Sequence, residues 1–561
     1  MTPVTRGVAG PSGGPAPQPD TVPWPADYAA RYRAAGHWAD QPLGHWPRRW
    51  AEAHGDRTAL VDGATRLTYR ELADRVDALA GALREQGLCR GDRIVVQLPN
   101  SWEFVALVLA CFRSGIVPVL ALTAHRAHEL AHLLRHAEAR LLVVPDRWRD
   151  FDHQALAARI AAEAPGECRV LVKGEADPGH LDLARLLAPG PGTRERAAAL
   201  DADRPHPDDV ALFLLSGGTT GLPKLIARTH NDYGYNVRRS AEVSGFDHST
   251  VFLAALPAGH NAVLGCPGIL GTLHSGGTVV LVPSPQAATA LTAVAAEGVT
   301  DVAVVPAVAQ QWVAEAAGGR YDLGTLRLVT LGGSVVDPAL ARRVRDELGG
   351  QVQQLYGMAE GLLCCTRPDD PDALVFGTQG RPVSPDDELL VVDEHDRPVP
   401  LGSTGELLTR GPYTPRGYYR AAEHNARAFT PDGWFRTGDL VRLHPGGYLT
   451  VEGRRKELIN RGGEKVSAEE VENLARLLVG VDRVAAVPLP DDRFGERVCL
   501  VLAPAGAAAP SLDDVRERFA RHGVAHYKLP EQLEVLTELP LTPVGKVDKK
   551  AIRERLATEE K

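Results

Sequence analysis

Short apolar runs alternate with longer amphipathic stretches along most of the chain. Runs of strand length lie at residues 93–99, 139–145, 277–283 and 326–334, and residues 71–87 are one of the stretches with helical spacing of apolar positions. Strands that are almost continuously apolar are typical of sheets covered by helices on both faces. The pattern therefore predicts an α/β fold with largely buried sheets.

The pattern changes in two places, which divide the chain into domains. Residues 385–450 carry short strand patterns and tight turns, and we expect this β-rich region to close a large domain of stacked α/β subdomains over residues 21–455. Residues 456–561 have the size and pattern of a small α+β domain. Residues 1–20 are rich in Gly, Pro and small side chains, which predicts a disordered tail.

Composition and charge narrow the class of protein. The chain has 561 residues, 44% of them hydrophobic and 24% charged, which is ordinary for a globular protein. A net charge of -9 argues against general binding of nucleic acid. The seven cysteines show no paired spacing, and no stretch has the pattern of a signal peptide or a membrane span. We therefore expect a cytoplasmic protein without a nucleic-acid or membrane partner.

A glycine- and hydroxyl-rich segment, LSGGTTGLPK at residues 215–224, directly follows the apolar run ALFLL. Glycines let the backbone wrap an anion with its N–H groups, while hydroxyls add donors and lysine adds positive charge. The spacing differs from a P-loop, because Gly221 and Lys224 are not adjacent. We predict that this segment grips a polyphosphate through Ser216, Gly217, Gly218, Thr219, Thr220, Gly221 and Lys224.

Five further motifs follow in order along the chain. They are YGMAE at 356–360, WFRTGD at 434–439, GRRKE at 453–457, NRGGEK at 460–465 and PVGK at 543–546. Together with the phosphate segment they resemble the signature of the adenylate-forming superfamily, which comprises acyl-CoA synthetases, adenylation domains of peptide synthetases and luciferases. Within it, the chain most resembles stand-alone aryl-acid AMP ligases that load 2,3-dihydroxybenzoate or salicylate. The lead-in VPWP at 22–25, with Tyr32 and Trp38, is similar to theirs.

This resemblance implies a two-step reaction. ATP and Mg²⁺ would activate an aryl acid as its acyl-adenylate with release of pyrophosphate. The acyl group would then pass to the phosphopantetheine thiol of a separate aryl carrier protein in siderophore or nonribosomal peptide synthesis. The sequence LGGS at 331–334 resembles a phosphopantetheine attachment site, but it closes a strand in mid-domain. We therefore expect the carrier to be another protein.

The resemblance also implies roles for residues outside the phosphate segment. Lys546 would bridge the carboxylate and the α-phosphate, Lys456 would be the hinge of the small domain, and His260 is the third catalytic candidate. Glu360 and Thr219 would hold Mg²⁺, which takes few protein ligands. The remaining nucleotide contacts would come from Gly333, Tyr356 beside adenine, Gly357, Met358, Asp439 on the ribose and Arg454.

Residues 256–268 resemble the aryl-acid pocket of these ligases. Amino-acid adenylation domains place an aspartate where Asn261 stands, to pair the substrate ammonium. A neutral amide can donate to a carboxylate or phenol oxygen, so Asn261 favours an ortho-hydroxy aryl acid, although it could instead cap a local turn. The expected acid contacts are Asn261, Ala262, Cys266, Gly332 and Leu363.

Three departures from the ligase pattern indicate which ring is bound. Enzymes for 2,3-dihydroxybenzoate tend to carry serine at Cys266 and valine at Leu363, so both residues suit hydrogen at ring carbon 3. Relatives carry Tyr or Phe at Ala262, and the freed volume could admit the methyl of 6-methylsalicylate or be refilled by a neighbour. The sequence therefore favours salicylate or a substituted salicylate over 2,3-dihydroxybenzoate or 3-hydroxyanthranilate.

Other functions remain as alternatives. An aryl-CoA ligase would differ only in its thiol acceptor, and a nucleotide-binding protein without catalysis would not need Lys546, Asp439 and Glu360 together. His128-Glu129-Leu130-Ala131-His132 fits the HExxH signature of zinc proteases, with His125 and His136 on the same face. A third ligand at a known spacing is missing, and we interpret the segment as a surface helix.

Overall fold

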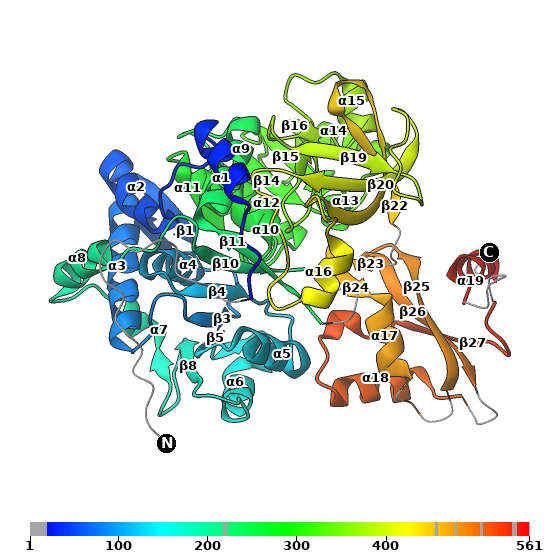
Figure 1. Ribbon diagram of the computed structural model, residues 1–561, viewed down its shortest axis with the longest axis horizontal. Coiled ribbons are helices and arrows are strands. Elements are labelled where there is room, and N and C mark those ends of the chain that lie inside the picture. Colours follow the sequence, from blue (N-terminus) through cyan, green and yellow to red (C-terminus); the bar gives the residue numbers. More distant parts are fainter. Residues whose placement is uncertain are drawn as a thin grey trace.

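The computed structural model describes residues 20–216, 222–454, 458–476, 478, 481–504, 509–540 and 547–559. Figure 1 shows two parts that lie side by side: strands β1 to β22 belong to the larger part, and β23 to β27 to the smaller one. The α/β fold class predicted from the sequence is confirmed. No helix among the described residues is long and apolar enough to cross a membrane.

Within the described ranges, the larger part contains a nine-stranded sheet with a parallel centre and antiparallel edges. Helices α12 to α14 pack on one of its faces through buried Leu291, Trp312 and Val344. The strands, in spatial order, are β18 (Arg381–Pro382), β17 (Leu363–Cys365), β16 (Gln351–Gly357), β15 (Leu328–Gly332), β14 (Asp301–Val304), β12 (Val251–Ala254), β13 (Thr278–Leu281), β1 (Thr58–Asp62) and β2 (Thr65–Thr68). The helices are α12 (Ala287–Glu297), α13 (Pro306–Ala316) and α14 (Pro338–Leu348).

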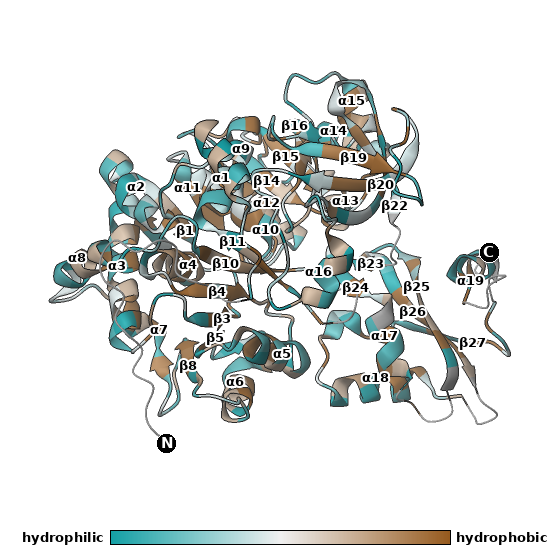
Figure 2. Cartoon of the chain, viewed as in Figure 1, coloured by the Kyte–Doolittle hydropathy of each residue, from teal (hydrophilic) through white to brown (hydrophobic). Residues whose placement is uncertain are grey.

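A second sheet, of seven strands among the described residues, lies beside the first. Its central strands β4 and β10 are coloured as hydrophobic in Figure 2, and buried Val95, Val119 and Phe213 pack against helices α5 and α6. The strands, in spatial order, are β11 (Leu225–Thr229), β10 (Val210–Leu215), β4 (Val117–Leu120), β3 (Arg93–Val96), β5 (Leu141–Pro145), β8 (Arg169–Lys173) and β9 (Leu181–Asp182). The helices are α5 (Ala127–Ala137) and α6 (His153–Ala162).

Helices α3 (Tyr69–Glu85) and α4 (Trp102–Ser114) form the core between the two sheets. In α3, the Thr68 side chain and Glu71 form a capping box that satisfies free N–H groups at the first turn. Every residue of α4 from Phe104 to Ser114 is buried, as expected for a helix that is apolar on all sides. Further elements of this part are α1 (Ala26–Ala34), α2 (Trp46–His54), α7 (Leu183–Leu187), α8 (Thr193–Ala202), α9 (His230–Val243), α10 (Asn261–Gly265) and α11 (Gly268–His274).

The β-rich region predicted at residues 385–450 is a four-stranded antiparallel sheet among the described residues. It consists of β19 (Glu388–Val392), β20 (Thr404–Arg410), β21 (Phe435–Leu443) and β22 (Leu449–Arg454), with α16 (Ala422–Ala428) between β20 and β21.

The smaller part has a sheet with helices α17 and α18 on one face and α19 on the other. Its elements are β23 (Leu458–Arg461), β24 (Glu464–Ser467), α17 (Ala468–Ala475), β25 (Val481–Asp491), β26 (Gly495–Pro504), α18 (Leu512–Arg521), β27 (Gln532–Val535) and α19 (Lys549–Glu559). Figure 1 shows the hairpin of β23 and β24 next to the larger part and α19 on the far side.

Candidate active site

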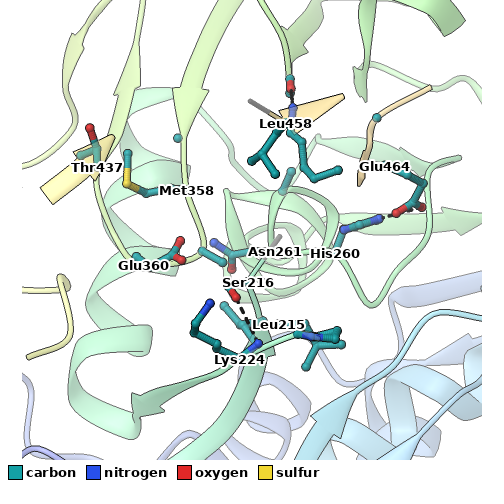
Figure 3. Close-up of a pocket in the computed structure, with 18 of the residues that line it drawn as sticks. Leu215, Ser216, Lys224, His260, Asn261, Met358, Glu360, Thr437, Leu458 and Glu464 are labelled. Atoms are coloured by element: carbon teal, nitrogen blue, oxygen red, sulfur yellow. Dashed lines mark hydrogen bonds and ion pairs between the residues drawn. The ribbon is translucent and has the colours of Figure 1, made fainter. Parts of the chain in front are cut away.

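A cavity of about 1110 Å³ lies where the two parts meet. Its walls come from strand ends at Leu215 and Gly357, from the start of α10 at Asn261, from β21 at Asp439 and from the hairpin at Gly463. Figure 3 shows side chains from both parts facing this space. Ligands of α/β proteins usually bind outside the carboxyl ends of parallel strands, and this cavity has that position.

The phosphate segment enters and leaves beside this cavity. The backbone N–H of Ser216 donates to the Lys224 carbonyl (3.0 Å), and the Lys224 N–H donates to Ser216 Oγ (3.1 Å). The Lys224 ammonium lies 5.9 Å from the centre of the Tyr418 ring, and both residues line the cavity. Gly217, Gly218, Thr219, Thr220 and Gly221 lie outside the described residues.

The expected nucleoside contacts lie together on another wall. The Tyr356 hydroxyl donates to Asp439 Oδ2 (2.7 Å), and the Asp439 side chain has only 1% exposure. Gly333, Gly357, Met358 and Asp439 line the cavity. Arg454 pairs with Asp439 across β21 and β22, which places its backbone behind this wall. A carboxylate held in this way can accept hydrogen bonds from a ribose diol.

Glu360 lines the cavity, and Figure 3 shows it between Met358 and Lys224. The Tyr418 hydroxyl donates to Glu360 Oε1 (2.7 Å), and burial together with this carboxylate raises the pKa of Tyr418 well above its usual value. Among the described residues, no group of three or more His, Cys, Asp or Glu could hold a metal ion. One carboxylate beside the expected phosphate segment still fits Mg²⁺, which usually takes its other ligands from water and phosphate.

The expected acid pocket is part of this cavity. Asn261, Ala262, Cys266 and Leu363 line it, and Cys266 and Leu363 are 3% and 2% exposed. The Tyr233 hydroxyl donates to Asn261 Oδ1 (2.9 Å). Burial raises the pKa of the Cys266 thiol to about 12, so it stays neutral. The side chains that line this part of the cavity are therefore uncharged and largely apolar.

Gly332 is the one expected acid contact that is absent from the cavity wall among the described residues. It is buried at the end of β15, where an added Cβ would lie 2.8 Å from the Leu355 carbonyl oxygen. Its neighbour Gly333 has a φ of +86° and lines the cavity. Gly332 thus allows β15 and β16 to approach closely beneath the site.

The hairpin of the smaller part closes the cavity. His260 Nε2 lies 3.3 Å from Glu464 Oε1, and the facing charges raise the pKa of His260 and lower that of Glu464. Lys465 Nζ and Asn460 Nδ2 both donate to the Gly333 carbonyl, at 2.5 and 3.2 Å. Lys456 and Lys546 lie outside the described residues.

The HExxH segment forms α5, but its polar side chains have separate partners. Glu129 is fully buried and lies 3.1 Å from Lys528 Nζ, whereas His132 Nε2 lies 3.1 Å from the Pro223 carbonyl oxygen. His125 Nδ1 accepts from the Leu122 N–H (3.2 Å). The expectation of a surface helix is wrong for this face, because the smaller part packs on it.

Sequence reasoning missed Tyr233, Tyr418, Glu464 and Lys465 as site residues. Glu464 and Lys465 stand in the NRGGEK motif, which indicates that the segment belongs to the site but not which residues these two side chains contact. Tyr418 and Tyr233 carry no local signal, because each reaches its partner from a remote segment.

Comparison with known proteins gives two family matches and many relatives. Residues 47–419 match the AMP-binding enzyme family, and residues 470–546 match the AMP-binding enzyme C-terminal domain. The chain is 58% identical over 535 residues to a salicylyl-CoA synthase / salicylate adenylyltransferase from a Streptomyces species, covering 95% of this chain and 97% of that protein. It is 46% identical over 536 residues to the 2,3-dihydroxybenzoate-AMP ligase of Bacillus subtilis (strain 168), covering 96% and 97%. Among solved structures, the apo structure of Mycobacterium smegmatis MbtA matches with 42% identity and a TM-score of 0.74, covering 96% and 99%.

Proposed function

The chain belongs to the AMP-binding enzyme family and, within it, to the aryl-acid adenylating enzymes, and from this premise we propose that it activates salicylate or a substituted salicylate and passes the acyl group to a phosphopantetheine thiol. The observation that carries the proposal is one cavity with two kinds of wall. Asn261, Cys266 and Leu363 line one part of the wall, and Asp439, which accepts from the Tyr356 hydroxyl, lines another.

The first half-reaction follows from this arrangement. An acid bound against Asn261 and a nucleotide bound against Asp439 would bring the carboxylate and the α-phosphate together between them. The two anions repel, so cationic groups such as Lys224 and Lys546 must screen the charge as the new bond forms. Enzymes of this family use ATP, and Mg²⁺ held by Glu360 would neutralise the departing pyrophosphate.

The second half-reaction is favoured by the position of the smaller part. Gly462 and Gly463 line the cavity without side chains that would fill it, while α19, which follows the Lys546 motif in sequence, lies on the opposite side of the small domain. A wall of glycines leaves room for a thin thiol arm. We infer that this arrangement serves acyl transfer and that a rotation about Lys456 exchanges it for the adenylating one.

The ring is proposed from the acid pocket and from relatives. Cys266 and Leu363 offer no good hydrogen-bond partner for a hydroxyl at carbon 3, and one relative at 58% identity is named for salicylate. The test is acid-dependent ATP–pyrophosphate exchange with salicylate, 6-methylsalicylate, 2,3-dihydroxybenzoate, benzoate and 3-hydroxyanthranilate. We expect the highest kcat/KM for salicylate or its 6-methyl derivative. A preference for 2,3-dihydroxybenzoate would refute this choice of ring.

The thiol acceptor has two candidates. A separate carrier protein fits the relatives named as AMP ligases, whereas coenzyme A fits the relative named salicylyl-CoA synthase and a Streptomyces carzinostaticus naphthoate–CoA ligase of 51% identity. We propose the carrier protein as the main acceptor. Thioester formation with each acceptor at equal concentration decides, and faster transfer to coenzyme A than to a phosphopantetheinylated aryl carrier protein would reverse the assignment.

A further inference from the structure

Tyr233 lies beneath the acid pocket and outside the cavity wall. It belongs to helix α9, its side chain has no exposure, and Arg228 lies 5.0 Å over its ring. A buried hydroxyl must find a hydrogen-bond acceptor, because leaving it unpaired is costly. Its hydroxyl donates to Asn261 Oδ1 at 2.9 Å. The carbonyl oxygen of the Asn261 amide is therefore already engaged in a hydrogen bond within the protein.

This hydrogen bond determines which group of the Asn261 amide faces a bound acid. Asn261 lines the cavity at the first residue of α10, between Glu360 and His260 in Figure 3. If the amide were turned over, the Tyr233 oxygen could accept from its NH₂ group, but the buried Tyr233 proton would lose Asn261 Oδ1 as its acceptor, which is costly. The amide nitrogen is consequently the group left for the ligand, and it can only donate.

We propose that Tyr233 is a positioning residue that holds the Asn261 amide with its nitrogen toward the bound acid and so selects ortho-hydroxy over ortho-amino aryl acids. The inference rests on the proposed function, since it assumes that an aryl acid occupies this end of the cavity. It assigns a role in specificity to a residue that does not itself touch the acid.

The selection follows from the hydrogen bonds of the two rings. In salicylate the phenol proton bonds internally to the carboxylate, and the phenol oxygen keeps a lone pair for the Asn261 N–H. In anthranilate the amine lone pair is delocalised into the ring, so the outward group is a second N–H. Two opposed donors in a buried site lose a hydrogen bond on both sides, which corresponds to a discrimination of about 10- to 100-fold.

The test is Tyr233→Phe, assayed by pyrophosphate exchange with salicylate, anthranilate and benzoate. Benzoate has no ortho group, so it reports general damage to the pocket. Without the hydroxyl the amide can turn over. We expect kcat/KM for anthranilate to rise at least about fivefold relative to benzoate, and that for salicylate to fall relative to benzoate. An equal change for all three acids would mean a purely structural role and would overturn the proposal.

The matched control is Tyr235→Phe on the same helix. Tyr235 is also buried, but its hydroxyl pairs with Ser384 (2.8 Å), so the acid ratios should stay unchanged. If Tyr233→Phe does not fold, Asn261→Asp decides, because Tyr233 would occupy one carboxylate oxygen and the other would accept from an ortho-amine. The kcat/KM for anthranilate must then rise relative to that for benzoate, and an unchanged ratio would overturn the proposal. A wild-type chain that activates none of these acids would instead refute the proposed function.

Discussion

At the scale of single residues, Cys266 and Leu363 are expected to set the ring substitution. Both are buried beside the proposed position of ring carbon 3. A hydroxyl there would be buried without a partner, at a cost of roughly 1–3 kcal/mol, or a discrimination of about 5- to 150-fold against 2,3-dihydroxybenzoate. We predict that Cys266→Ser narrows this gap by offering a partner, and that adding Leu363→Val narrows it further. A kcat/KM ratio that the serine leaves unchanged would contradict this account of the pocket.

The same scale shows how much of the site the sequence predicted. Asn261, Cys266, Tyr356, Glu360 and Asp439 stand in local motifs. All but Tyr356 line the cavity, and Tyr356 donates to Asp439. The groups that orient them were not predictable. Tyr233 sits in helix α9 with the pattern of an ordinary core residue, and Tyr418 belongs to a loop 58 positions from Glu360. Only the tertiary fold brings such hydroxyls to their partners.

At the scale of elements, the buried strands were predicted well. The apolar runs at 93–99, 139–145, 277–283 and 326–334 contain β3, β5, β13 and β15, because a strand covered on both faces has no polar face to obscure it. Helix α5 was misjudged, since a polar helix face is the same in sequence whether it meets solvent or another domain. Its Glu129 is fully buried against the smaller part.

Helix α5 supplies a prediction at this scale. Glu129 joins the parts by accepting from the Ala525 N–H (3.1 Å) and by pairing with Lys528, which also pairs with Glu470 (2.9 Å). Glu129→Gln keeps the acceptor but removes the charge between the parts. We predict that thioester formation from supplied acyl-adenylate falls about three- to tenfold while adenylation changes less than about twofold. The control is Glu163→Gln, at an exposed position after α6. Equal loss of both steps would contradict a docking role.

At the scale of the whole molecule, several titratable groups respond to docking of the two parts. Burial and the nearby Glu129 raise the pKa of Glu470 to about 7, despite its pairing with Lys528. The Glu464 carboxylate raises the pKa of His260. A group whose pKa is raised on docking stabilises the docked state while it is protonated. This contribution is lost as the pH rises through the raised pKa. Burial lowers the pKa of His128, which opposes docking only in more acidic solution.

We therefore predict that docking weakens as the pH rises above about 7, the value to which the pKa of Glu470 is raised, a range in which His128 is already neutral. The His128 backbone N–H donates to the Gly523 carbonyl across the interface (3.1 Å), so its hydrogen exchange reports docking. Its protection factor, corrected for the intrinsic exchange rate, should fall over this range. Glu464→Gln should flatten the profile, because His260 then loses its charged partner. A protection factor that rises with pH would contradict the assignment.

The two half-reactions should separate at Lys546. Its charge is needed while the carboxylate and α-phosphate converge, so we predict that Lys546→Ala lowers adenylation by about 100-fold or more and leaves ATP and acid binding nearly intact. Thioester transfer from supplied acyl-adenylate should persist, because in the described arrangement the smaller part contributes its β23–β24 hairpin to the cavity wall. Adenylation at the wild-type rate in this variant would remove Lys546 from the mechanism.

The most direct measurement is the product formed by the wild-type chain from ATP, Mg²⁺ and salicylate when no thiol acceptor is present. Mass spectrometry of the quenched enzyme, with pyrophosphate measured in parallel, identifies the bond that forms and the group that leaves. We predict enzyme-bound salicyl-adenylate and an equal amount of pyrophosphate, neither of which appears without the acid. Formation of ADP and phosphate, or pyrophosphate release that does not depend on an aryl acid, would contradict aryl-acid adenylation by this chain.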